Sequence, residues 1–293
     1  MIRLFYYSNN FGDELSPYII NKLSGEPICY YNPFSFKKVL RNSLSILSSI
    51  ARGRFSNIGK LSAFTLSPII IGAGSLLESA TSRCIIWGTG MAQKSFIPKG
   101  GKFLMTRGYL SRKVVEDAGF HVQSTLCGDP ALLLPRLFYP NTHTEYKTGI
   151  VCHNADYEYL KSRWEGLNNI NIIHLRGSNV EKVINEICSC SFIYSSSLHG
   201  LIVSHAYGIP ALWFEHTRLT GDRFKFYDYF SSVHIPFYHP FTVEEVENSG
   251  FTATLEPEKL YIDSRLLHDI QDELIRLAPF IIKPKLSQIS DRD

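Results

Sequence analysis

The sequence predicts an α/β fold with two similar lobes, each built around a parallel β-sheet. Three observations support this prediction. Short apolar runs of strand type alternate with stretches of helical spacing along most of the chain. Many of these runs end in glycine or polar residues just before the next helix, as in parallel sheets with crossover helices. Residues 135–146, rich in proline, histidine, threonine and asparagine, interrupt the alternation, and the same order then resumes.

The composition is that of a globular protein and excludes several classes. A chain of 293 residues with 44% hydrophobic content is long enough for two domains of ordinary size. A net charge of +3, without a zinc finger or an aromatic RNA-binding motif, argues against nucleic acid as a partner. The six cysteines form no C-x-x-C pair, so we expect free thiols and no metal site. Without a signal peptide or an apolar run of transmembrane length, we expect a cytoplasmic protein.

The first lobe is expected to span residues 1–138. Asp13 is expected to cap a helix that ends at Gly25, and Ser111 is expected to cap the helix that follows Arg107. The predicted strands of this lobe are residues 2–7, 27–31, 68–71, 84–87 and 102–105, with one more before Leu126.

The second lobe is expected to span residues 147–280, with a tail at 281–293. Ser178 or Asn179 is expected to cap one of its helices. Residues 215–238 are aromatic and polar, and we interpret them as irregular. The predicted strands are 148–152, 170–175, 192–194 and 211–214, and the last predicted helix is 265–277.

A basic segment lies within the first lobe at residues 36–60. It contains lysines and arginines but no acidic residue, and its apolar residues have helical spacing. This pattern suits a membrane surface or a lipid-linked anionic substrate. An ordinary domain helix with a basic rim is the alternative.

A strand gives way to a helix at Ser195, Ser196, Ser197 and His199. Such a junction points free backbone N–H groups and the positive end of the helix dipole at the same place, which favours anions. The serine hydroxyls add donors, and the imidazole can transfer a proton near neutral pH. The alternative is that His199 is a cap or a core residue.

Other candidate residues also follow predicted strands. Arg107 suits a carboxylate or a phosphate, with a surface salt bridge as the alternative. Asp129 is either a turn carboxylate or an active-site acid, and Asp13 is either a cap or a ligand. The glycine turns at residues 72–75 and 87–90 match neither a P-loop nor the full dinucleotide fingerprint, so they indicate only a close approach of a ligand or a neighbouring backbone.

Short motifs follow the predicted strands in a fixed order along the chain. They are Asn10-Phe11-Gly12-Asp13, Gly72-Ala73-Gly74-Ser75, Trp87-Gly88-Thr89-Gly90, Arg107-Gly108-Tyr109-Leu110-Ser111, Cys127-Gly128-Asp129-Pro130-Ala131 and Ser196-Ser197-Leu198-His199-Gly200, followed by Ala206-Tyr207-Gly208-Ile209-Pro210. The order of these motifs resembles the polysaccharide pyruvyl transferase family. The resemblance implies two Rossmann-like lobes that face a cleft, as in glycosyltransferase-B enzymes. It also implies transfer of a pyruvyl group from phosphoenolpyruvate to a glycan.

The resemblance also suggests roles for individual residues. His199 is expected to transfer the proton, with Asp129 and His153 as candidates for activating the sugar hydroxyl. Family members often carry arginine where this chain has Ser197, and Arg107, Arg176 or Arg218 could replace it. The expected donor-binding residues are Arg107, Ser195, Ser196, Ser197, Leu198, Gly200, Gly74 and Ser75, and the expected acceptor-binding residues are Asn10, Asp13 and Arg218.

The expected partners are phosphoenolpyruvate and a glycan or polyprenyl-linked oligosaccharide, with possible peripheral contact at the cytoplasmic face of the membrane. No cofactor and no metal are expected. Two other functions are compatible with the sequence. One is a nucleotide-sugar-dependent glycosyltransferase of the same architecture, and the other is a glycan-binding module without activity.

Overall fold

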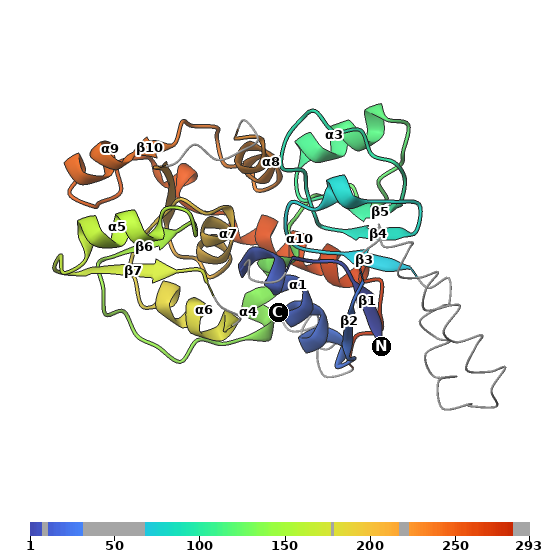
Figure 1. Ribbon diagram of the computed structural model, residues 1–293, viewed down its shortest axis with the longest axis horizontal. Helices are drawn as coiled ribbons and strands as arrows, with labels where there is room; N and C mark the ends of the chain where they lie inside the picture. Colours follow the sequence, from blue (N-terminus) through green and yellow to red (C-terminus); the bar gives the residue numbers. More distant parts are fainter. Residues whose placement is uncertain (8–10, 32–67, 177–178, 217–222, 284–293) are drawn as a thin grey trace, which may run out of the picture.

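The computed structural model describes residues 1–7, 11–31, 68–176, 179–216 and 223–283, and these residues form two five-stranded parallel sheets. The first sheet has the strand order β2-β1-β3-β4-β5 (Figure 1). Its strands are β1 (Ile2–Leu4), β2 (Ile28–Tyr30), β3 (Ile69–Ile71), β4 (Cys84–Trp87) and β5 (Lys102–Met105).

The second sheet has the order β10-β9-β8-β6-β7, and all of its pairs are parallel. The prediction of an α/β fold with two Rossmann-like lobes is therefore confirmed. The strands of this sheet are β6 (Thr148–Cys152), β7 (Ile170–His174), β8 (Ile193–Ser195), β9 (Ala211–Glu215) and β10 (Phe241–Thr242).

The two sheets share one topology. In each lobe the first strand lies between the second and the third, and the fourth and fifth strands follow on the side of the third. From β1 the chain crosses to the neighbouring strand on one side of the sheet, and from β3 it crosses to the neighbouring strand on the other side. The second sheet has the same reversal between β6 and β8. Ligands of doubly wound sheets bind at the carboxyl ends of strands where this reversal occurs. Each lobe thus contributes one such switch point.

The strands form where the sequence is apolar throughout, because helices cover both faces of these sheets. All three residues of β3 and all five of β6 are buried. The helices are α1 (Phe11–Ser24), α3 (Tyr109–Asp117), α4 (Leu134–Leu137), α5 (Tyr157–Trp164), α6 (Val180–Cys188), α7 (Leu198–Ala206), α8 (Phe224–Ser232), α9 (Val243–Asn248) and α10 (Ser264–Arg276), and the 3₁₀ turns are η2 (Leu77–Ser79), η3 (Pro130–Leu133) and η4 (Pro257–Lys259).

Several local predictions hold and others fail. Asn179 caps α6, since its side chain accepts from the Lys182 amide. Asp13 and Ser111 do not cap their helices, because α1 begins at Phe11 and α3 at Tyr109.

Two predicted elements also differ from the structure. The strand expected before Leu126 is reduced to a single bridge between Phe103 and Val122. The segment interpreted as irregular, residues 215–238, contains α8.

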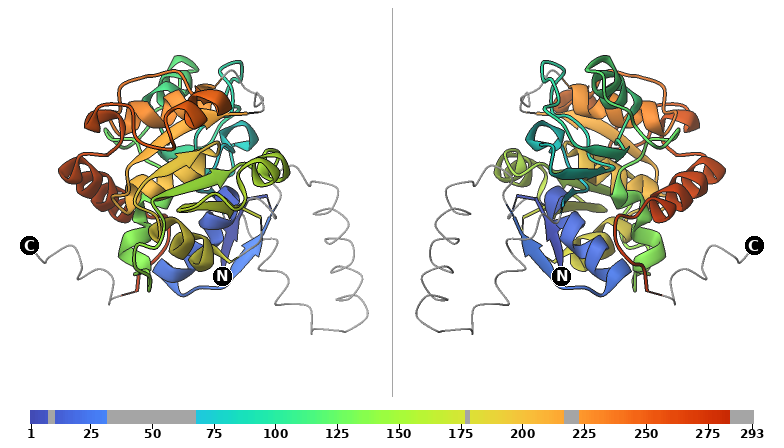
Figure 2. Two further views of the ribbon diagram at one scale, coloured as in Figure 1. Left: turned by 90° about the vertical axis from the view of Figure 1, so that its left-hand side faces the viewer. Right: turned by 90° about the vertical axis from the view of Figure 1, so that its right-hand side faces the viewer.

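The two lobes share a core. Helix α10, which the sequence grouped with residues 147–280, packs against the first lobe, where Trp87 Nε1 donates to the Leu274 carbonyl at 3.0 Å. Gln271 Nε2 donates to the Leu132 carbonyl at 2.7 Å. Figure 2 shows α10 on the outside of the molecule beside α4, where Arg136 donates to Gln271. One continuous apolar cluster extends from Leu4 to Leu277 across both lobes.

The basic segment at 36–60 lies outside the described residues, so the helix predicted there stays a prediction. Of the tail, only residues 281–283 are described. Within the described ranges, no helix combines the length and the apolar character needed to cross a membrane.

Candidate functional site

His199 and Asp129 face one another between the two lobes. His199 is the second residue of α7, directly after the switch point at β8, and its Nε2 lies 3.7 Å from Asp129 Oδ2. The His199 side chain is 11% exposed, and the Asp129 side chain is fully buried. Neither of these two atoms has a hydrogen-bond partner among the described residues. A separation of 3.7 Å is too long for a hydrogen bond, so both atoms remain able to bind a ligand.

Asp129 is held by its other oxygen. Its Oδ1 accepts from the Ala131 amide at 2.9 Å and so caps η3. This bond fixes the carboxylate while Oδ2 points towards His199. The Asp129 carboxylate is thus both a turn residue and a member of the site.

The first turn of α1 packs against the His199 ring at Gly12. A Cβ on Gly12 would lie 2.0 Å from His199 Nδ1, so only glycine allows the ring to take this position. Asp13 follows, and burial together with the charge of Asp129 raises its pKa to about 7. Gly74 has φ +111°, and a Cβ there would lie 2.3 Å from Asp13 Oδ1. The switch point of the first lobe thus supplies Asp13 in addition to Asp129, and of these two the Asp13 carboxyl group has a pKa of about 7.

The serine run has mainly structural roles. Ser195 Oγ donates to the Ser197 carbonyl at 2.8 Å, and Ser196 Oγ accepts from the His153 amide at 2.9 Å. The first bond closes the turn from β8 into α7, and the second joins the end of β8 to the end of β6. Ser197 is the N-cap residue of α7, and its side chain makes no capping hydrogen bond. Of the three serines, Ser197 therefore has the hydroxyl best placed to meet a ligand at the helix amino end.

The neighbours of this run support the same turn. A Cβ on Gly200 would lie 2.2 Å from Ser195 Oγ, so glycine is required for the strand to meet the helix there. Leu198 is buried in the shared core. Leu198 and Gly200, expected to bind the donor, thus contribute packing and backbone geometry.

His153 follows β6, and its side chain lies on the same sheet edge as His199. Burial and the charge of Lys225 lower the pKa of His153, while Asp156 opposes the shift. The ring is therefore neutral at pH 7 and able to accept a proton.

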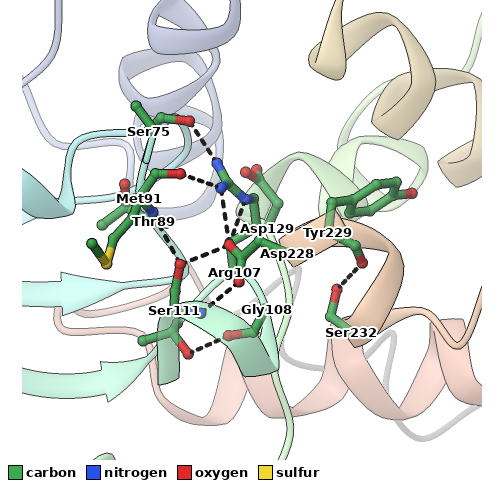
Figure 3. A network of polar contacts seen from close by, with 12 residues as sticks. Ser75, Thr89, Met91, Arg107, Gly108, Ser111, Asp129, Asp228, Tyr229 and Ser232 are labelled. Carbon is green, nitrogen blue, oxygen red and sulfur yellow. Dashed lines mark hydrogen bonds and ion pairs between the residues drawn. The ribbon is translucent and has the colours of Figure 1, made fainter. Parts of the chain in front are cut away.

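Arg107 has a different environment from the one expected. Its side chain is fully buried, and its Nη2 lies 2.9 Å from Asp228 Oδ2 (Figure 3). The Nε donates to Asp228, Nη1 donates to Ser75 Oγ and the Gly74 carbonyl, and Nη2 also donates to the Met91 carbonyl. Four of the five N–H groups of the guanidinium make these hydrogen bonds, and the ion pair with Asp228 balances its charge. The buried Arg107 side chain is therefore engaged within the protein, and the surface salt bridge considered as its alternative is excluded.

Asp228 completes this buried network. Its Oδ1 accepts from the Ser111 amide and its Oδ2 accepts from the Ser111 hydroxyl, both at 2.7 Å. Burial raises the pKa of Asp228, whereas Arg107 and the Ser111 bonds oppose that shift. The network joins α8 to the end of β5 and to the start of α3.

The glycine motifs of the first lobe make room for this network. A Cβ on Gly90 would lie 2.5 Å from Arg107 Cζ, and one on Gly108 would overlap the Asp228 carbonyl. The close approach predicted for these glycines is therefore that of neighbouring protein groups.

Lys225, in the first turn of α8, is a site residue that the sequence did not reveal. Its charge acts on both Asp13 and His153, so its ammonium lies near both switch points. The spacing of three residues from Lys225 to Asp228 would have been a signal only if this segment had been predicted as a helix. Arg176 is exposed, and Asn10 and Arg218 lie outside the described residues.

A pocket of about 380 Å³ opens where β9 and β10 end. It is lined by Glu215, His216, Arg223, Pro240, Phe241 and Thr242. Arg223 Nη2 lies 2.9 Å from Glu215 Oε2. In the described part of the chain, no group of three or more His, Cys, Asp or Glu side chains is arranged to hold a metal ion.

The arrangement combines proton-transfer groups with anion-binding features. An imidazole, two buried carboxyl groups and an ammonium converge at the meeting of two switch points, next to the amino end of α7. Such a site can bind a small anion and move protons to and from it.

Comparison with known proteins agrees with the resemblance seen in the sequence. The family model described as polysaccharide pyruvyl transferase matches residues 10–218. An uncharacterized protein of Acanthamoeba polyphaga mimivirus is 32% identical over 167 residues, which cover 54% of this chain and 58% of that protein. The chain thus matches little more than half the length of this curated relative. No solved structure matches the chain. Because the family model covers most of the chain, the chain belongs to the polysaccharide pyruvyl transferase family.

Proposed function

We propose that this protein transfers a pyruvyl group from phosphoenolpyruvate to a sugar of a cell-surface polysaccharide or of its lipid-linked precursor, forming a pyruvate ketal and releasing phosphate. Membership of the family supports pyruvyl transfer to a polysaccharide. The observation that carries the proposal is the facing pair of His199 and Asp129, two buried groups whose nearest atoms have no hydrogen-bond partner in the described ranges. Such a pair can exchange protons with a ligand between the lobes.

The reaction needs groups that move protons. Ketal formation begins when a proton is added to the methylene carbon of phosphoenolpyruvate, which leaves a cationic carbon at C2. One sugar hydroxyl then attacks C2. A second hydroxyl of the same sugar attacks C2 in turn, and the bond from C2 to the phosphate oxygen breaks. The two hydroxyl protons are accounted for by the new methyl group and the released phosphate, so no redox cofactor is required.

His199 is the group we assign to the proton transfer. Its Nε2 lies 3.7 Å from Asp129 Oδ2, so the imidazole is placed to carry a proton between this carboxylate and a ligand. Asp129 or the neutral His153 then accepts the proton of the attacking hydroxyl. Asp13 holds a further proton beside them, because its pKa is raised to about 7. The amino end of α7, with the Ser197 hydroxyl, contributes donors for an anionic group of the donor.

The pocket at the ends of β9 and β10 is where we place the acceptor sugar. Carboxylate, guanidinium and hydroxyl groups there, from Glu215, Arg223 and Thr242, suit the hydroxyls of a carbohydrate, and Phe241 adds an apolar surface.

The basic segment at residues 36–60 favours an acceptor on a polyprenyl lipid and a peripheral position at the inner face of the membrane. Co-sedimentation with anionic liposomes tests this assignment, which fails if charge-removing variants of Lys37, Lys38 and Arg41 bind as well as the unaltered protein.

The test of the function is phosphate release from phosphoenolpyruvate with a panel of galactosides, glucosides and N-acetylmannosamine glycans. The ketal methyl group in the product is then identified by NMR. His199→Gln and Asp129→Asn are expected to lower kcat by about 10²- to 10⁴-fold, which is the usual contribution of a general acid or base. His121→Gln is the matched control, because His121 is an exposed histidine away from the site.

Two results would contradict the proposal. One is the absence of phosphate release with every acceptor, together with turnover of a nucleotide sugar, which would indicate a glycosyltransferase. The other is unchanged turnover in His199→Gln, which would place the chemistry elsewhere.

A further inference from the structure

Lys225 carries a positive charge on a partly buried side chain at the junction of the two lobes. It lies in the first turn of α8, three residues before Asp228, so the two side chains share one face of the helix. Asp228 is fixed by Arg107 and Ser111 of the first lobe. Phe226 stacks on Trp213 of the second lobe, with ring centroids 4.0 Å apart and an interplanar angle of 9°. Helix α8 is therefore held from both sides, and the position of Lys225 is determined by packing.

The charged neighbours of Lys225 come from both lobes. Asp13 belongs to α1 of the first lobe, and Glu215 ends β9 of the second lobe. Both carboxylates attract the ammonium, whereas the Arg107 guanidinium repels it. His153, after β6, is affected by the same charge. The ammonium thus lies among the groups that follow the two switch points.

Lys225 has no ion-pair or hydrogen-bond partner in the parts of the chain that the structure describes. Its one direct contact of a polar kind there is with the Phe226 ring, whose centroid is 5.3 Å from Nζ. A partly buried ammonium that forms no ion pair is unfavourable, because the carboxylates at longer range offset only part of its desolvation. Burial, and then the charge of Arg107, lowers the pKa of Lys225 to about 8. At pH 7 the side chain is still about 90% protonated. A protonated lysine in this environment is suited to bind an anionic substrate reversibly.

The proposed donor needs such a group. Phosphoenolpyruvate is an anion, and the carboxylate of Asp129, together with the ionised fraction of Asp13, would repel it from the His199 imidazole. The other cations near the site form ion pairs, Arg107 with Asp228 and Arg223 with Glu215. Ser197 is uncharged. Among the described residues at the site, Lys225 is the cation that forms no direct ion pair.

We propose that Lys225 binds the phosphate or the carboxylate of the donor substrate and so provides the positive charge that Ser197 lacks. This inference rests on the proposed function. It identifies Lys225 as a residue that contacts substrate, with Arg107 and Asp228 as positioning residues that hold α8 in place.

The test measures the affinity of the protein for inorganic phosphate, pyruvate and phosphoenolpyruvate by isothermal titration calorimetry. Lys225→Met keeps the length of the side chain and removes the charge. It is expected to weaken phosphoenolpyruvate binding about tenfold or more, as loss of a charge-assisted contact does. Phosphate affinity falls in parallel if Lys225 binds the phosphate, and pyruvate affinity falls if it binds the carboxylate. Lys225→Arg is expected to restore part of the lost affinity.

The controls separate binding from folding. Lys182→Met removes an exposed lysine, 70% exposed on α6, and is expected to leave all three affinities unchanged. A purely structural role for Lys225 would lower the melting temperature of Lys225→Met without changing its affinities or its KM for phosphoenolpyruvate. Lys225→Gln replaces Lys225→Met if the latter does not fold.

The outcomes distinguish this inference from the proposed function. Equal affinities in folded Lys225→Met and the unaltered protein would overturn the inference while leaving pyruvyl transfer in place. Absence of binding of all three anions to the unaltered protein would overturn it as well. Phosphate binding that depends on Lys225, in a protein that releases no phosphate from phosphoenolpyruvate, would support the inference and refute the function.

Discussion

Replacing Asp228 by alanine should strongly destabilise the protein. The substitution leaves the Arg107 guanidinium without its counterion. Because both side chains are 0% exposed in the native state, water cannot replace the lost carboxylate. It also removes the acceptor for the Ser111 amide and hydroxyl. Removing one partner of a buried ion pair costs about 3–5 kcal/mol, and the lost Ser111 acceptor adds to the upper part of that range. We expect a loss of about 4 kcal/mol in the free energy of unfolding.

The assay compares Asp228→Ala with a double-mutant cycle of Arg107→Met and Asp228→Leu, each made singly and together, by chemical and thermal denaturation. At about 2–4 °C per kcal/mol, Asp228→Ala should lower the melting temperature by about 8–16 °C. The double variant Arg107→Met with Asp228→Leu removes both charges and fills similar space, so it should recover much of this loss. Phosphate affinity should also fall in Asp228→Ala, since α8 then loses the anchor that positions Lys225.

Two results would refute the reasoning about this ion pair. One is a loss below about 1 kcal/mol in Asp228→Ala, a value typical of exposed pairs. The other is a double variant whose loss equals the sum of the single losses, because it would mean that the two groups are not coupled.

Two further predictions concern the centre of the site. The folded-state pKa of Asp13 is about 7 against its ordinary 3.8, so its contribution to stability is fully present below about pH 4 and is lost as pH rises through 7. Asp13→Asn should therefore stabilise the protein at pH 8, by at most about 4 kcal/mol, and change little near pH 3, with an intermediate effect at pH 5; equal effects at pH 8 and pH 3 in thermal denaturation would contradict this. Gly12→Ala places a Cβ 2.0 Å from His199 Nδ1, so it should displace the ring and lower kcat for phosphate release about tenfold or more while the protein stays folded. An unchanged kcat would show that the position of the ring does not limit the reaction.

The strands and the site residues that follow them were predictable because both depend on local sequence. Buried parallel strands are continuous apolar runs, as in Ile69–Ile71, and they end where polar residues or glycines begin. Parallel strands also place their carboxyl ends at one edge, which is why Asp13, His153 and His199 could be selected as candidates. Their placement at two equivalent switch points required the strand order, which the sequence does not contain.

The elements that escaped prediction depend on distant partners. Helix α8 is rich in aromatic residues of modest helix propensity, and it is stabilised by the contact of Phe226 with Trp213 and of Asp228 with Arg107. Without a predicted helix, Lys225 could not be placed beside the site. The environment of Arg107 was missed for the same reason, since its counterion lies 121 positions along the chain. An arginine after a strand looks the same in sequence whether it meets substrate or a buried carboxylate.

The return of α10 to the first lobe affects how the protein reaches its native state. As the polypeptide leaves the ribosome, the Trp87 indole emerges long before its acceptor at Leu274, which comes 187 positions later. Arg107 likewise emerges well ahead of Asp228. The amino-terminal half therefore cannot finish folding before α10 has been synthesised, although many domains fold in order of synthesis. A fragment that stops before α10 should remain incompletely folded, and the His199 centre should form only after α10 has left the ribosome.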